Sequence, residues 1–91
     1  MDFPTVAAMS NRTILGAAVR AIREARAVAD PGKFAGSRVA IAAGMSHAYL
    51  CNIEKGRKYP PEPVIARIAD ALGVEVDAIS YLTDTATEVA S

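Results

Sequence analysis

Apolar residues recur at helical spacing in several separate stretches of the chain. The first stretch has apolar residues three or four positions apart, which places them on one face of a helix running from about Arg12 to Ala27. The residues of this face are Leu15, Ala18, Val19 and Ile22. The pattern leaves Arg12, Arg20 and Glu24 on the outer side of that helix.

A second helical pattern covers Pro61 to Leu72, where Pro61 suits a first turn and Gly73 ends the helix. Its apolar face consists of Val64, Ile65, Ile68, Ala69 and Leu72. Shorter apolar patterns predict a helix over Ser37–Ala43 and another over Ala78–Leu82, with Asp77 as its cap or first-turn acid. The prediction is an all-α protein, a compact five-helix bundle.

The remaining helix begins at Ser46 and stops at Gly56. Gly44 can turn the chain at positive φ, and the Ser46 hydroxyl can accept a hydrogen bond from a free amide of the first helical turn. Met45 and Leu50 are spaced for a hydrophobic staple around this cap. A short helix entered by a tight glycine turn, directly after the helix Ser37–Ala43, predicts a helix-turn-helix.

The segment between the first two helices, Val28 to Gly36, contains Asp30-Pro31-Gly32-Lys33, and this composition predicts a loop. Phe34 is its one large apolar residue, and we expect it to pack on the core. The predicted domain is 12–82, with an N-terminal tail over 1–11 and a C-terminal tail over 83–91.

Composition narrows the class of protein. Of the 91 residues, 52% are hydrophobic and only 5% aromatic, which favours closely packed small helices over a sheet. The single cysteine gives no internal disulfide, and no apolar run approaches the roughly 20 residues needed to span a bilayer. Because the first residues also lack the pattern of a signal peptide, we expect a soluble, cytoplasmic protein.

Charge is divided unevenly along a chain whose net charge is zero. Nine basic residues oppose three acidic ones between Arg12 and Lys58, a net charge of +6. One basic residue opposes six acidic ones after Lys58, a net charge of −5, and Asp2 supplies the remaining −1. The basic half contains the predicted helix-turn-helix, so it can present a basic face to phosphate groups. Ordinary solvated surface charge is the alternative interpretation.

Four runs of residues together resemble the Cro/C1-type (XRE) helix-turn-helix family, the lambda-repressor-like DNA-binding domains of phage repressors and bacterial regulators. They are Val19–Arg23, Gly44–Gly56, Gly56–Pro60 and Ile68–Asp77. The resemblance covers about Leu15 to Leu82. It implies double-stranded DNA as the partner, a homodimer on half-sites, and no cofactor.

By this resemblance the start of the helix after Gly44 reads bases in the major groove. The matching residues are His47, Ala48 and Asn52, with Tyr49 and Cys51 at the margin. An Asn side chain can pair with adenine, and an Ala methyl group can contact thymine. His47 can donate to a guanine or to a phosphate. Some of these residues would be bystanders on a solvated face, most of all Cys51.

Phosphate contacts are expected from groups that flank this helix. The candidates are Lys33, Ser37, Arg38, Ser46, Lys55, Arg57 and Lys58. One departure from the family concerns its second helix, which corresponds to Ser37–Ala43 here. In the family this helix usually begins with Ser or Thr and then a Gln that contacts phosphate. Here the connection is about six residues longer and the Gln is absent, so Lys33, Ser37 or Arg38 is expected to replace it.

The resemblance also implies a structural ion pair between Arg23 and Glu54, which would hold the base-reading helix against the first helix. A dimer interface is expected at Val76, Ile79, Tyr81 and Leu82, although these residues could instead only close the core. No set of residues for nucleophilic catalysis is present, so we expect no enzymatic activity. His47, Cys51 and Glu54 share one helix, but they do not amount to a closed metal site, so no metal is expected.

The sequence therefore predicts a sequence-specific DNA-binding regulator, most simply a repressor that occupies an operator. We expect no second, ligand-sensing domain. The alternative is an antitoxin or adaptor that chiefly binds a partner protein through segments within 1–11 or 83–91.

Overall fold

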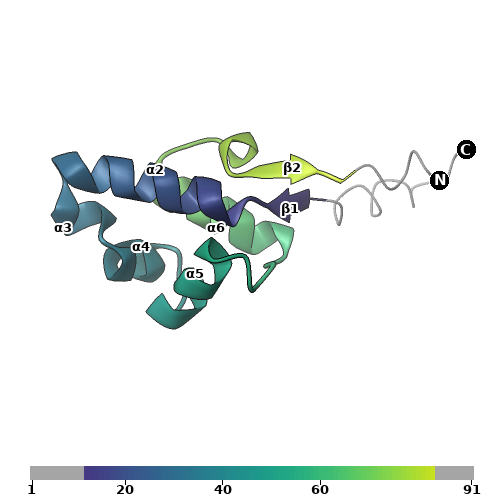
Figure 1. Ribbon diagram of the computed structural model, residues 1–91, viewed down its shortest axis with the longest axis horizontal. Helices are drawn as coiled ribbons and strands as arrows, with labels where there is room; N and C mark the ends of the chain where they lie inside the picture. Colours follow the sequence, from purple (N-terminus) through teal and green to yellow (C-terminus); the bar gives the residue numbers. More distant parts are fainter. Residues whose placement is uncertain (1–11, 84–91) are drawn as a thin grey trace, which may run out of the picture.

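Five α-helices and a two-stranded ribbon make up residues 12–83, the part of the chain that the computed structural model describes (Figure 1). In chain order the elements are β1 (Arg12–Ile14), α2 (Gly16–Ala29), α3 (Pro31–Phe34), α4 (Gly36–Ala42), α5 (His47–Glu54), α6 (Glu62–Leu72), the 3-10 helix η1 (Val76–Ala78) and β2 (Ser80–Leu82). The all-α fold class is confirmed, and the sheet is a minor part of it. The expected N-terminal tail over 1–11 lies outside the described residues, and so does the expected C-terminal tail over 83–91 except for Thr83.

One apolar core is shared by α2, α4, α5, α6 and the β1–β2 ribbon. α6 contributes more of it than any other element, with Ile65, Ile68 and Leu72 completely buried, as its apolar spacing predicts. The fully or nearly fully buried partners are Ile14, Val19, Val39, Ala40, Ala43, Leu50, Ile53, Ala69 and Ile79. No helix within residues 12–83 is long and apolar enough to cross a membrane.

The limits of α6 follow from its proline and glycine residues. Pro61 is the residue before the helix, Pro63 lies in the first turn, and Gly73 ends the helix in the left-handed conformation at φ 74°. Proline suits the first turn because the amide it lacks has no intrahelical acceptor there. α6 also positions α4, because Arg67 Nε donates a hydrogen bond of 2.9 Å to the carbonyl of Ala43.

The expected start of the first helix at Arg12 is wrong. Residues Arg12–Ile14 form β1, which pairs antiparallel with β2 so that Ile14 faces Ser80 and Arg12 faces Leu82. Leu15 continues the link by donating its amide to the Ile79 carbonyl at 2.7 Å. Leu15 precedes α2 and is 40% exposed, so it does not belong to the buried face of that helix.

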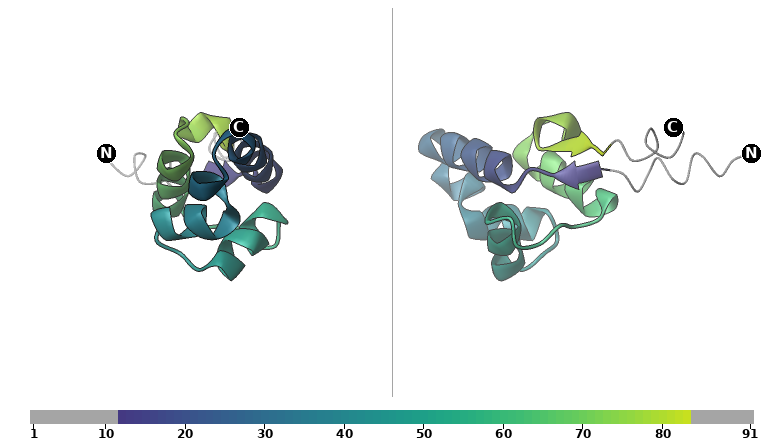
Figure 2. Two further views of the ribbon diagram at one scale, coloured as in Figure 1. Left: turned by 90° about the vertical axis from the view of Figure 1, so that its left-hand side faces the viewer. Right: turned by 45° about the vertical axis from the view of Figure 1, so that its right-hand side comes forward.

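The expected helix over Ala78–Leu82 is also wrong. This stretch holds the end of η1 and then β2, whose backbone hydrogen bonds run to β1 at the far end of the sequence. Figures 1 and 2 show the two strands side by side at one end of the molecule. A five-residue helix would gain few internal hydrogen bonds, whereas pairing with β1 gives the backbone of Ser80–Leu82 partners across the ribbon.

The segment expected to be a loop, Val28 to Gly36, contains the short helix α3. Pro31 occupies its first turn, and the Asp30 carboxylate accepts a hydrogen bond of 3.2 Å from the Lys33 amide. Asp followed by Pro marks a helix start as well as a turn, which explains the error. Phe34 is half-buried against the core, as expected. α4 begins at Gly36, and the expected cap Ser37 makes no capping hydrogen bond.

Candidate nucleic-acid interface

The connection between α4 and α5 is a tight glycine turn. Gly44 has φ 75°, and the amide of Met45 donates to the Ala40 carbonyl at 2.9 Å. A residue with a Cβ would be strained at this φ. The turn sets α5 across α4, and both helices lie on the lower side of the molecule in Figure 1. The helix-turn-helix geometry is therefore present.

Ser46 caps α5 as its sequence predicts. Its Oγ accepts a hydrogen bond of 3.1 Å from the Tyr49 amide. Met45 before the cap packs against the core, and Leu50 in the next turn is buried. The cap and these two apolar contacts fix the direction in which the first turn of α5 leaves the protein.

The residues expected to read bases occupy different environments on α5. Ala48 is exposed, and Asn52, one turn later on the same side, is half-exposed. Tyr49 is half-buried and packs against the core, and Cys51 is a free, half-exposed thiol. Because Leu50 and Ile53 point into the core, Ala48 and Asn52 share the outer face of the helix.

His47 is exposed, but its ring lies against the first residue of α4. A Cβ added to Gly36 would stand 2.7 Å from His47 Nε2 and 3.7 Å from Arg23 Cζ. With the ring in this position, a Cβ at residue 36 would force the exposed imidazole to shift. The ring therefore spans the junction of α4 and α5, a position that the sequence pattern did not predict.

α5 is held against α2 by an ion pair between Arg23 and Glu54. Arg23 Nε donates to Glu54 Oε2 at 2.7 Å, and Arg23 Nη2 donates to Glu54 Oε1 at 3.0 Å. The Glu54 side chain is only 6% exposed and the Arg23 side chain 15%. The hydrogen bond to Glu54 raises the pKa of Arg23 above its ordinary value, against the lowering effect of burial. Two parallel hydrogen bonds of this kind fix orientation as well as distance.

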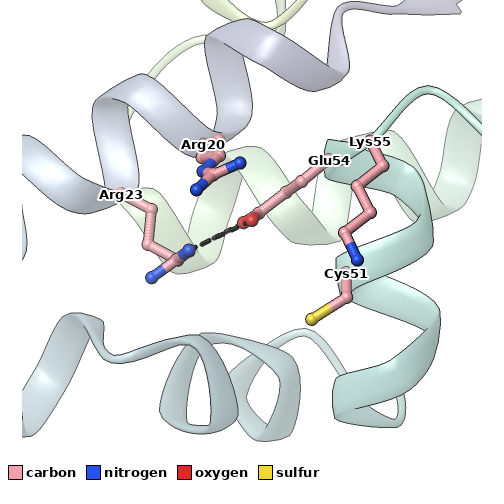
Figure 3. Close-up of a pocket in the computed structure, with 5 residues that line it drawn as sticks. All are labelled: Arg20, Arg23, Cys51, Glu54 and Lys55. Carbon is pink, nitrogen blue, oxygen red and sulfur yellow. Dashed lines mark hydrogen bonds and ion pairs between the residues drawn. The ribbon is translucent and has the colours of Figure 1, made fainter.

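A small pocket of about 140 Å³ lies beside this ion pair, between α2 and α5 (Figure 3). Its lining is Arg20, Arg23, Cys51, Glu54 and Lys55. The lining carries three cations and one carboxylate, and Glu24 pairs with Arg20 at 3.0 Å, so one positive charge is left over at this face. In residues 12–83 no three His, Cys, Asp or Glu side chains are grouped to hold a metal ion.

The basic residues expected at phosphates lie on two sides of α5. Lys55, Arg57 and Lys58 are exposed in the loop after the helix, where Gly56 has φ 78° and the Arg57 amide donates to the Asn52 carbonyl at 2.8 Å. Lys33, Ser37 and Arg38 are exposed on α3 and α4, which lie on the other side of α5 from this loop in Figure 1. Ser46 is exposed, with its hydroxyl engaged in the cap.

Two expectations about individual side chains are corrected. Ile79 is completely buried in the core of this chain, so it offers no surface for a dimer, whereas Tyr81 and Leu82 are 49% and 63% exposed. Val76 is half-buried and packs on the core. Arg12 does not point outward. It lies between Asp77, Ser80 and Glu62 because the ribbon turns its side chain back onto the domain.

The fold and this geometry define a small helical protein built around a helix-turn-helix. A family model described as a helix-turn-helix domain matches residues 14–82, and the chain belongs to that family. The family is associated with DNA-binding domains of the XRE type. Comparison with curated proteins found no match. Comparison with solved structures found none either.

Proposed function

We propose that this protein is a sequence-specific DNA-binding regulator of transcription, most simply a repressor that occupies its operator. The observation that carries the proposal is the presentation of α5. The helix is entered by a capped turn and fixed to α2 by the Arg23–Glu54 pair, and it leaves Ala48 and Asn52 together on its outer face. A rigid helix with short side chains on its outer face fits the major groove closely.

In this proposal Asn52 makes a bidentate contact with adenine, and the Ala48 methyl group contacts thymine. His47 spans α4 and α5, so its place at the edge of the groove favours a phosphate or an outer guanine. Tyr49, at the margin, supports the helix from the core side. Each good base contact is worth about 1–3 kcal/mol of discrimination.

Phosphate contacts on both sides of α5 supply affinity and register without sequence preference. Lys55, Arg57 and Lys58 serve one side of the groove. Lys33, Ser37 and Arg38 serve the other side, with the exposed start of α5 at Ser46 between the two groups. This arrangement explains how a protein of zero net charge binds DNA, since nearly all of its basic residues precede Tyr59.

We further propose that two copies bind one operator. The exposed Tyr81 and Leu82 on β2, with the adjacent Val76, are the surface for the second copy. One helix-turn-helix makes few base contacts, so pairing two of them on half-sites about one helical turn apart raises specificity.

The test begins with selection of duplexes from a randomised library by the full chain. Fluorescence anisotropy then compares the selected duplex with a scrambled one, and the stoichiometry of the complex gives the number of copies. We expect the selected duplex to bind at least about a thousandfold more tightly. Asn52→Ala should lose about 1–3 kcal/mol of that preference. Asp70→Ala, on the exposed side of α6, is the matched control and should leave the preference unchanged.

Equal binding of both duplexes by the wild-type chain would refute sequence-specific regulation and leave only phosphate binding. Absence of any DNA binding would refute the whole proposal and favour the antitoxin or adaptor alternative. Recovery of one stoichiometric small protein with this chain would then support that alternative.

A further inference from the structure

Phe34, the last residue of α3, holds two cationic groups over its ring. Arg26 Cζ lies 5.9 Å and Lys33 Nζ 5.5 Å from the ring centroid. Cations within about 6 Å of an aromatic face are attracted by its quadrupole. The ring is half-buried against the core, so it forms a fixed platform for two side chains that are themselves exposed.

The charge of this cluster is not neutralised within the described part of the chain. Neither Arg26 nor Lys33 forms an ion pair with another residue of 12–83, and the same holds for Arg38 on the neighbouring α4. Asp30, the residue before α3, keeps its negative charge while its carboxylate accepts from the Lys33 amide, so these three cations and Asp30 carry a net charge of +2. A net positive surface therefore remains, which is complementary to a polyanion.

The position of α3 relates this surface to α5. α3 lies between the end of α2 and the start of α4 (Figures 1 and 2). Only Ala35 separates it from Gly36, and Gly36 touches the ring of His47, the first residue of α5. The end of α3 is therefore one residue away from the part of α4 that lies against His47, at the end of α5 that enters the groove in the proposed complex.

We infer that α3, together with Arg26 from the last turn of α2, is an additional DNA contact, in which Arg26 and Lys33 bind backbone phosphates that flank the bases read by α5. The ligand is double-stranded DNA, and the inference rests on the proposed function, whose Lys33 contact it extends to a second cation, Arg26. Phe34 restricts both side chains before binding, so less side-chain entropy is lost when they meet phosphate. The long connection between α2 and α4 then lengthens the stretch of DNA that the protein contacts. It replaces the phosphate contact that a Gln at the start of the following helix usually makes in the family.

Two measurements on the double variant Arg26→Gln/Lys33→Gln test the inference. The first is the dependence of log K on log salt concentration, with the selected duplex and with a scrambled duplex. The slope should become shallower by about 0.9 for each phosphate that the variant no longer neutralises, about 1.8 for two, on either duplex. The control Ala66→Glu/Ala78→Glu makes the same change in net charge at exposed positions of α6 and η1, and it should change the slope far less.

The second measurement shortens the selected duplex from each end by one base pair at a time. The wild-type chain should lose affinity when the flanking phosphates are removed, whereas the double variant should be insensitive to that step. Thermal midpoints of both variants, compared with that of the wild-type chain, show whether the fold is intact.

An unchanged salt slope, or equal sensitivity of wild type and double variant to the shorter duplex, would overturn the role of α3. The selected duplex would still outcompete the scrambled one in that case, so the proposed function would survive. Equal binding of the selected and scrambled duplexes by the wild-type chain would instead refute the proposed function. The α3 contact would then still be supported by a shallower slope on scrambled DNA, because phosphate contacts do not depend on sequence.

Discussion

Gly16 and Glu54 determine how closely α5 approaches α2. A Cβ at Gly16 would collide with the carbonyl oxygen of Ile53, so the start of α2 rests directly on the last turn of α5. Glu54, the next residue of α5, then reaches Arg23, which lies further along α2. The resemblance to the family implied the Arg23–Glu54 pair. The local sequence around Gly16 did not indicate that this residue packs against α5, because the carbonyl oxygen that it meets belongs to Ile53, far away in the sequence.

At this scale we expect Glu54→Ala to destabilise the domain by about 2–3 kcal/mol, because it leaves Arg23 largely buried without its carboxylate. For a domain of this size that lowers Tm by roughly 10–20 °C. Glu24→Ala is the control, since the Glu24–Arg20 pair is exposed on both sides and should contribute little. Thermal unfolding followed by circular dichroism measures both. Equal, small shifts would show that the buried pair is not structural.

Among the elements, those with a long apolar period or a clear cap are predicted well by the sequence. α6 has five apolar positions on one face and a glycine stop, and α5 has its Ser46 cap and Gly44 turn. The sequence predicts a loop in place of α3 because one turn of helix has no periodicity to detect. It predicts the start of a helix in place of β1 and a short helix in place of β2. Three-residue strands carry no pattern of their own, and their hydrogen bonds come from a partner at the opposite end of the sequence.

The capping of α5 gives a prediction for a single element. Ser46→Ala should cost about 1 kcal/mol, because the Tyr49 amide loses its acceptor at the helix start. The corresponding Tm shift is roughly 4–8 °C. Ser37→Ala removes an exposed serine that makes no cap in α4, and it should stay within about 0.5 kcal/mol of wild type. If both variants had the same stability in denaturant titrations, the cap would contribute nothing.

Arg12 ties the start of the described chain to its end and thereby closes the whole domain. Its Nη1 donates to Asp77 at 2.7 Å and to the Ser80 hydroxyl at 2.9 Å, and its Nε lies 3.5 Å from Glu62. The Arg12 side chain is 11% exposed, and its Nε has no hydrogen-bond partner in the described structure. One side chain therefore connects β1, α6, η1 and β2.

We expect Arg12→Met to loosen the ribbon without unfolding the helices. The methionine keeps the apolar stem but loses both hydrogen bonds, which contribute on the order of 1–2 kcal/mol because Asp77 remains solvated. Hydrogen exchange should accelerate in the peptides containing Ile14 and Ile79, and it should change little in α5. Asp77→Asn, at an exposed position, should have a smaller effect in the same peptides. Uniform acceleration through all helices would contradict a local role.

By itself the sequence determined the helical class, the extents of α5 and α6, the turn at Gly44 and the division of charge, because each depends on neighbours within a few residues. Only the tertiary structure decided the β1–β2 ribbon, the inward turn of Arg12, the burial of Ile79 and the packing of α3 against α2 and α4. These features depend on pairing between residues distant in sequence, where the gain in hydrogen bonds and buried surface outweighs local propensity. The contact between Gly36 and His47 was also decided by the tertiary structure, because it depends on the space between α4 and α5.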